Sequence, residues 1–234
     1  MKKSLLVLAL AAAFTPILAQ AEAGDWVVRA RAVNVSPNED SKLGKTVNAD
    51  LGATVMNPGA ELAVDDNWIP EVDISYYITK NIAAELILAL GTRHDVSIEG
   101  DAGNPIGNQN LGSVNLLPPT LTLQWHFNPD QMIDPYVGAG INYTNMLDRK
   151  LSFSSGIRAG NDIKIDSDSW GYALQAGVDV NLKDGWLINA DVKYVTIDTD
   201  VKARLGAGNT GAWTKIDELD INPWVFGLGI GKKF

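Results

Sequence analysis

The chain of 234 residues contains no cysteine, so no disulfide can hold it together. Histidine is scarce, with only His94 and His126, and basic residues are outnumbered, since 19 Lys and Arg stand against 28 Asp and Glu. This acidic balance argues against nucleic acid as a partner, because phosphates favour a basic surface. After the N-terminal segment, no apolar run approaches the roughly 20 residues of a membrane-spanning helix. Helical periodicity is also absent there.

The N-terminus has the pattern of a secretory signal peptide. Two lysines precede the apolar run SLLVLALAAAFTPILA, and the small-residue pattern AQA follows at 19–21. We predict cleavage after Ala21, with Ala23 as the alternative site and a retained N-terminal anchor as the competing interpretation. Residues 1–21 are thus assigned to the signal peptide. The remaining domain, residues 22–234, has 17 basic and 28 acidic residues and a net charge near −11.

Eight segments of this domain alternate apolar and polar residues with a period of two, which is typical of β-strands. They cover about 25–35, 68–78, 82–96, 114–127, 135–146, 169–182, 186–203 and 219–234. Three connections are short, whereas those at about 36–67, 97–113, 147–168 and 200–218 are long and rich in Gly, Asn, Asp and Ser. Short periplasmic turns, long extracellular loops and an even strand number indicate an antiparallel transmembrane β-barrel.

The two faces of the predicted strands support this interpretation. One face is apolar, and its aromatic residues gather near the short turns (Trp26, Tyr76, Trp125, Phe127, Trp186 and Phe234) and near the long loops (Tyr143, Trp170, Trp224 and Phe226). Aromatic rings settle at the two interfaces of a bilayer. We therefore predict an all-β fold, an eight-stranded barrel in the bacterial outer membrane, in contact with lipid and lipopolysaccharide.

The opposite face of the strands is polar and charged. Eight strands enclose a lumen that side chains can fill, and charges buried in it should pair with one another. We therefore predict a polar plug instead of an open water pore, built from Arg29, Arg31, Glu71, Asp73, Glu85, His126, Asp179 and Asp191.

Three stretches, LPPTLTLQWHF, DPYVGAGINYT and DINPWVFGLGIGKKF, resemble the OmpW family of small bacterial outer-membrane proteins, and DSWGYALQAGVDV and DGWLINADVKYVTIDTD fit the same order. The resemblance runs from about Gly24 to the C-terminus. It implies an eight-stranded barrel and passive uptake of small hydrophobic molecules, which leave sideways through the barrel wall into the bilayer. The terminal Phe234 resembles the signal by which the outer-membrane assembly machinery recognises its clients, although Lys232 departs from the aromatic residue often found there.

Four residues are candidates for a constriction or gate. Ile87 and Lys193 match positions where family members narrow the barrel with apolar side chains. Ile87 keeps that character, or simply fills the lumen, whereas Lys193 replaces a large aromatic residue with a cation that could pair with an inward carboxylate. Pro118 and Pro119 cannot donate to a β-ladder, so they mark either a lateral opening in the wall or the start of a strand.

Catalytic and metal-binding patterns are weak. His94 is followed by Asp95, but adjacent strand residues face opposite sides, and His126 points into the predicted lumen. The stretch DIKIDSDS at 162–169 lacks the glycine and terminal glutamate of a calcium loop. We predict a channel that is not an enzyme and needs no metal or cofactor. A surface receptor or adhesin acting through the long loops and a lipid-modifying enzyme are the competing interpretations.

Overall fold

The computed structural model describes residues 22–234, so the predicted signal peptide at 1–21 lies outside the described residues. Eight antiparallel strands close into a barrel in the order β1 (Trp26–Ser36), β3 (Asn67–Tyr77), β4 (Ile82–Ala89), β7 (Thr120–His126), β8 (Ile133–Asp148), β11 (Asp168–Asn181), β12 (Trp186–Val195) and β15 (Trp224–Lys233). The last strand pairs back with the first, with Val27 opposite Lys233. A closed ladder leaves no unpaired edge in hydrocarbon, and the prediction of an eight-stranded barrel is confirmed.

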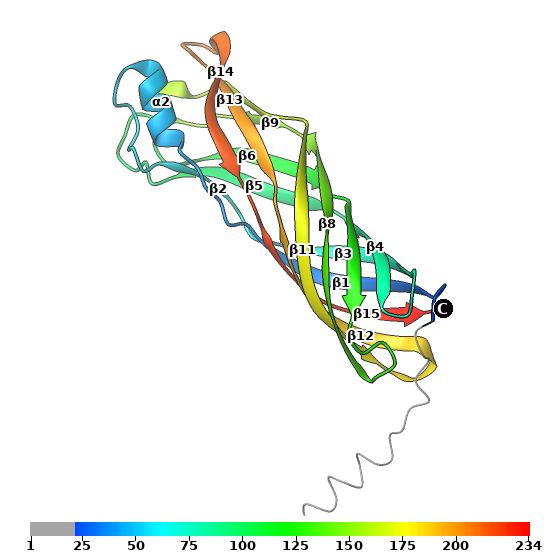
Figure 1. The fold of residues 1–234 in the computed structure, drawn as a ribbon. Coiled ribbons are helices and arrows are strands. Elements are labelled where there is room, and N and C mark those ends of the chain that lie inside the picture. Colours follow the sequence, from blue (N-terminus) through cyan, green and yellow to red (C-terminus); the bar gives the residue numbers. More distant parts are fainter. Residues whose placement is uncertain (1–21) are drawn as a thin grey trace, which may run out of the picture.

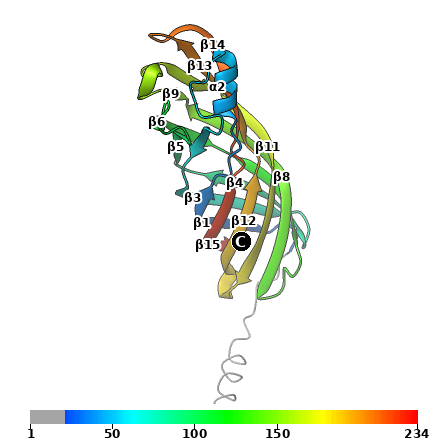
Figure 2. The ribbon, with the colours of Figure 1, turned by 90° about the vertical axis from the view of Figure 1, so that its left-hand side faces the viewer.

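The predicted long loops are folded as well and form a cap at one end of the barrel (Figures 1 and 2). Three strands extend the barrel wall beyond β8: β6 (Gln109–Leu117), β5 (Thr92–Glu99) and β2 (Glu61–Val64). A separate sheet contains β14 (Thr210–Asp220), β13 (Asp198–Gly206), β10 (Asp162–Ile165) and β9 (Lys150–Ser152). The chain's C-terminus lies at the other end of the barrel (Figure 1).

The cap also contains a helix, α2 (Leu43–Leu51), so the prediction that no helix follows the N-terminal segment was wrong. The helix has only nine residues, and Gly52 ends it in the left-handed conformation at φ 60°. Short 3₁₀ turns occur at η1 (Gly156–Arg158) and η2 (Lys183–Gly185). None of the helices within residues 22–234 has the length and apolar composition needed to span a bilayer.

Four of the predicted strand segments break where they pass from barrel to cap. Segments 82–96, 114–127, 186–203 and 219–234 each become two strands, because the two sheets of the cap diverge from the barrel wall. The space between these sheets is filled by buried apolar side chains, among them Leu43, Met56, Ile106, Phe153, Ile163 and Ile216. Burial of this core explains why segments that look like polar loops are ordered.

The outer face of the barrel is apolar, and its aromatic residues lie towards both ends. Exposed side chains include Trp26, Tyr76, Trp125, Phe127, Trp186 and Phe234 near the turns, and Trp170, Trp224 and Phe226 near the cap, with Leu86, Leu123, Leu174 and Ile188 also exposed. This is the surface that a bilayer stabilises.

Candidate functional site

The barrel interior holds a single ion-pair network of eight side chains: Arg29, Arg31, Glu71, Asp73, Glu85, Asp179, Asp191 and Lys193. Arg29 contacts Asp179 at 2.6 Å, Asp73 at 3.2 Å and Glu85 at 3.5 Å. Arg31 contacts Glu71 and Asp73 at 3.0 Å each, and Glu85 at 3.3 Å. All eight side chains are buried, so these charges are stabilised by ion pairs inside the protein instead of by water.

The strand register explains how these groups meet. Arg29 and Arg31 are two residues apart on β1 and therefore share its inner face. On β3, Asp73 lies directly opposite Arg29 and Glu71 opposite Arg31. On the other side of β1, the glycines of β15 leave room for the long side chains. A Cβ at Gly231 would lie 2.8 Å from Cγ of Arg29, which is too close for a stable contact.

His126 lies at the turn end of the network and is held by its neighbours. Its Nδ1 is 2.7 Å from Oδ2 of Asp134, and the hydroxyl of Tyr77 lies 3.3 Å from the ring nitrogens. Among the described residues these contacts bring no serine or threonine hydroxyl to His126, so its surroundings are those of a packed structural histidine.

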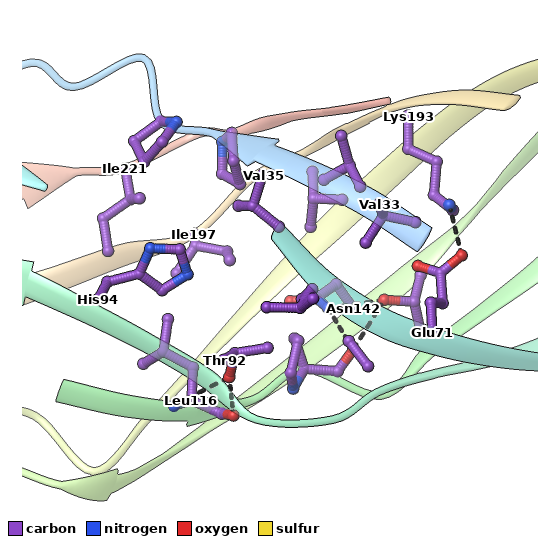
Figure 3. Close-up of a pocket in the computed structure, with 18 of the residues that line it drawn as sticks. Val33, Val35, Glu71, Thr92, His94, Leu116, Asn142, Lys193, Ile197 and Ile221 are labelled. Atoms are coloured by element: carbon purple, nitrogen blue, oxygen red, sulfur yellow. Dashed lines mark hydrogen bonds and ion pairs between the residues drawn. The ribbon is translucent and has the colours of Figure 1, made fainter. Parts of the chain in front are cut away.

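An apolar pocket lies inside the barrel, between the ion-pair network and the cap (Figure 3). Its walls are largely aliphatic and come from both the barrel and the cap: Val33, Val35, Val64, Ile69, Ile87, Ala89, Leu116, Val195, Ile197, Ile221 and Val225, with Pro37, Pro118 and Pro223. Its polar members are Glu71, Thr92, His94, Thr120, Asn142 and Lys193. Figure 3 shows Glu71 and Lys193 at one end of the pocket and His94 at the other.

Three of the four gate candidates line this pocket. Ile87 contributes to its wall, Pro118 to its side and Lys193 to the end that adjoins the ion-pair network, whereas Pro119 is not among the lining residues. Lys193 Nζ lies 2.8 Å from Glu71 and 2.7 Å from Asp191. Lys193 is therefore paired twice, at the end of the apolar space.

The barrel wall has an interruption beside the pocket. The ladder between β4 and β7 ends at the pair Ile87–Thr120, and the ladder between β5 and β6 begins at Thr92–Leu116. Pro118 and Pro119 lie between these pairs, and neither has an N–H to donate. On their other edge, the carbonyl of Pro119 accepts a hydrogen bond from the amide of Tyr143 at 3.1 Å. The segment with the two prolines is thus hydrogen-bonded to β8 along one edge. Along its other edge, no ladder pair joins it to the described residues between β4 and β5.

The environment of His94 is not the His–Asp pair that its sequence neighbour Asp95 suggests. It is 2% exposed, and Nδ1 lies 2.8 Å from the backbone oxygen of Asp65, while Asp95 faces outward. The sequence pattern argued against a catalytic role for His94 and gave no sign of its place in the pocket. The pocket walls from the cap, such as Ile197 and Ile221, were not predicted, because those residues lie where predicted strands were expected to run straight on.

The comparisons with known proteins agree on one family. A model described as the OmpW family matches residues 22–234. Outer membrane protein W of Vibrio cholerae is 36% identical over 238 residues, covering 100% of both chains. The crystal structure of the outer membrane protein OprG from Pseudomonas aeruginosa superposes with a TM-score of 0.73 at 30% identity, covering 91% of this chain and 97% of that one. The structure of outer membrane protein AlkL in lipid bilayers gives 0.59 at 26% identity, with coverage of 94% and 95%.

Proposed function

This chain belongs to the OmpW family and is a bacterial outer-membrane β-barrel protein, and from that premise we propose that it is a channel for passive uptake of small hydrophobic molecules. In this proposal the solute enters from the cap side, occupies the apolar pocket, and leaves sideways through the wall into the bilayer. Residues 1–21 act as the cleaved signal peptide, and Phe234 is the contact for the assembly machinery.

The proposal rests on the apolar pocket. Its inner end is closed by the ion-pair network, and on one side the strands of the barrel wall are not joined by a ladder. A hydrophobic solute that continued along the barrel axis would have to separate Lys193 from Glu71 and displace both arginines from their carboxylates. Removing one partner of a buried ion pair destabilises a protein by about 3–5 kcal/mol. The ion-pair network therefore favours a route that avoids the axis.

The sideways route meets apolar surface instead. Leu90 and Leu117 flank the unpaired segment and are 52% and 38% exposed on the outer face. A solute passing between them moves from an aliphatic pocket to the lipid without contacting a charge. Pro118 supports this route because it lines the pocket and lies in the gap of the ladder.

A non-enzymatic role is part of the same proposal. Nδ1 of His94 is engaged by the Asp65 carbonyl, and His126 by Asp134 and Tyr77. Neither arrangement provides the nucleophile and base that hydrolytic chemistry requires.

The test is uptake of a hydrophobic solute by liposomes that contain or lack the folded chain of residues 22–234. We expect faster equilibration with the protein and no dependence on added energy. An identical rate with and without protein would contradict a channel. If deletions in the cap also abolished binding of cells or phage, the receptor or adhesin interpretation would replace it.

A further inference from the structure

One polar atom on the pocket wall, Nε2 of His94, has no partner among the described protein groups. His94 lines the pocket and is 2% exposed. Its Nδ1 is 2.8 Å from the Asp65 carbonyl oxygen, but within residues 22–234 its Nε2 has no hydrogen-bond or ion-pair partner. A polar atom without a protein partner on an otherwise apolar wall is a point where a ligand can gain affinity by supplying that partner.

The hydrogen bond from Nδ1 to the Asp65 carbonyl determines whether Nε2 is a donor or an acceptor. A backbone carbonyl only accepts, so Nδ1 carries the proton that it receives. In a neutral imidazole the other nitrogen is then an acceptor. His94 therefore presents a lone pair at one end of the aliphatic pocket, opposite the Glu71–Lys193 pair (Figure 3).

We propose that His94 determines which solutes the pocket prefers, by accepting a hydrogen bond from an uncharged solute that has an apolar body and one hydroxyl group. Alkanols and phenols belong to this class, and plain hydrocarbons do not. The inference rests on the proposed channel function, whose pocket it describes in more detail.

Charge in the barrel argues against an ionised head group. The described network joins five carboxylates to three cations, namely Glu71, Asp73, Glu85, Asp179 and Asp191 with Arg29, Arg31 and Lys193. An anionic solute would meet this excess of negative charge, because Lys193 is already paired with Glu71 and Asp191. A cationic solute would have to displace Lys193 from Glu71. An uncharged solute that donates a hydrogen bond meets neither obstacle.

The lining of the pocket fits the same class. Small-molecule sites are mostly apolar with a few placed polar groups, and this pocket follows that pattern. The chain of an alkanol would lie against the aliphatic walls, with its hydroxyl directed to the end where His94 lies. A solute with several polar groups would leave some of them unpaired against the aliphatic walls.

The experiment measures binding of 1-octanol and octane to the folded chain in phospholipid nanodiscs, with partitioning into empty nanodiscs subtracted. We expect the wild type to prefer octanol by about tenfold, the value of one well-placed hydrogen bond, and H94L to lose this preference. H94Q should keep most of it, because the amide can donate to Asp65 and still accept from the solute. R93Q is the matched control, since Arg93 is the outward-facing neighbour and does not line the pocket.

A second measurement does not depend on any variant folding. The ¹⁵N resonance of His94 Nε2 in the wild type should shift with octanol and stay in place with octane. Equal binding of both solutes by the wild type, or an unchanged octanol preference in H94L, overturns the inference. Liposome uptake separates the two proposals: His94-dependent binding without uptake contradicts only the channel, and uptake without octanol preference contradicts only the role of His94.

Discussion

Lys193 Nζ lies 2.8 Å from Glu71 Oε1, and this pair forms the boundary between the apolar pocket and the ion-pair network. The two residues are on β12 and β3 and are 122 positions apart in sequence. The barrel interior is therefore divided into an apolar compartment and a charged one.

Replacing Lys193 with methionine should destabilise the barrel by about 3–5 kcal/mol, because Asp191 would remain buried without its paired cation and Glu71 would keep only Arg31. The double variant E71Q/K193M should recover much of this loss. Urea unfolding in micelles, followed by tryptophan fluorescence, gives both values. Additive effects of the single changes would mean that the pair is not coupled.

Replacing Pro118 and Pro119 with threonine should slow release of a hydrophobic solute, because each new residue restores a backbone N–H that can strengthen hydrogen bonding within the wall at this point. The matched control is P135V, in β8 at the turn end of the wall and away from the pocket. Liposome uptake rates compare the three proteins. If the threonine variant folds and transports at the wild-type rate, the solute does not leave at this seam.

Gly229→Ala should destabilise the barrel by about 1–3 kcal/mol, since the new Cβ would overlap the backbone oxygen of Ala30 and crowd Cγ of Arg31. Gly227→Ala is the control in the same strand. The closest atoms to its Cβ would be side-chain atoms of Val33 and Arg31, at 3.2 and 3.3 Å, with the backbone oxygen of Asp191 at an ordinary 3.8 Å, so the change should cost less than about 1 kcal/mol. Heat-induced mobility shifts on gels measure the folded fraction of each, and equal shifts would refute the packing argument.

Acidification should strengthen the contact between α2 and β14. Burial raises the pKa of Asp217, which accepts hydrogen bonds from the Ser41 hydroxyl at 2.5 Å and the Lys42 amide at 3.0 Å. A carboxyl with a raised folded-state pKa binds more protons when folded, so its stability contribution is complete below the unfolded pKa and is lost as the pH rises through the folded pKa.

Hydrogen-exchange protection of the α2 amides, corrected for intrinsic rates, should therefore increase from about pH 7 to about pH 4.5. In D217N most of this increase should disappear. The pKa of Asp220 is also raised, by burial and by Asp198 and Asp40, so a small dependence should remain. Protection that fell on acidification in the wild type would contradict the assignment.

The barrel could be predicted because the sequence pattern that specifies it is local. A period of two specifies which side chains point inward, and Arg29, Glu71 and Lys193 are all found on the face that this rule gives them. The same rule placed Trp26 and Trp224 on the outer face, where they are exposed. Chain closure then follows from the need to pair β1 with β15 in a bilayer.

The cap was not predictable in the same way, because its order depends on distant contacts. Helix α2 is short, and it is held by packing of Leu43 and Val47 in a core shared with Phe153 and Ile216. The pocket has the same dependence, since Ile197 and Ile221 reach it only after the chain bends away from the barrel. The spacing of residues in the sequence does not indicate that His94 and Lys193 lie at opposite ends of one pocket.

The position of the two arginines on the first strand has a consequence for biogenesis. Arg29 also bonds to Asp179 on β11 and Arg31 to Asn189 on β12. These partners arrive only with the later strands, so a half-inserted intermediate would hold the two guanidinium groups against the carboxylates of β3 and β4 alone. The later strands thus complete the surroundings of the arginines as they close the barrel, and intermediates trapped before that step should be recognisable by guanidinium groups still open to solvent.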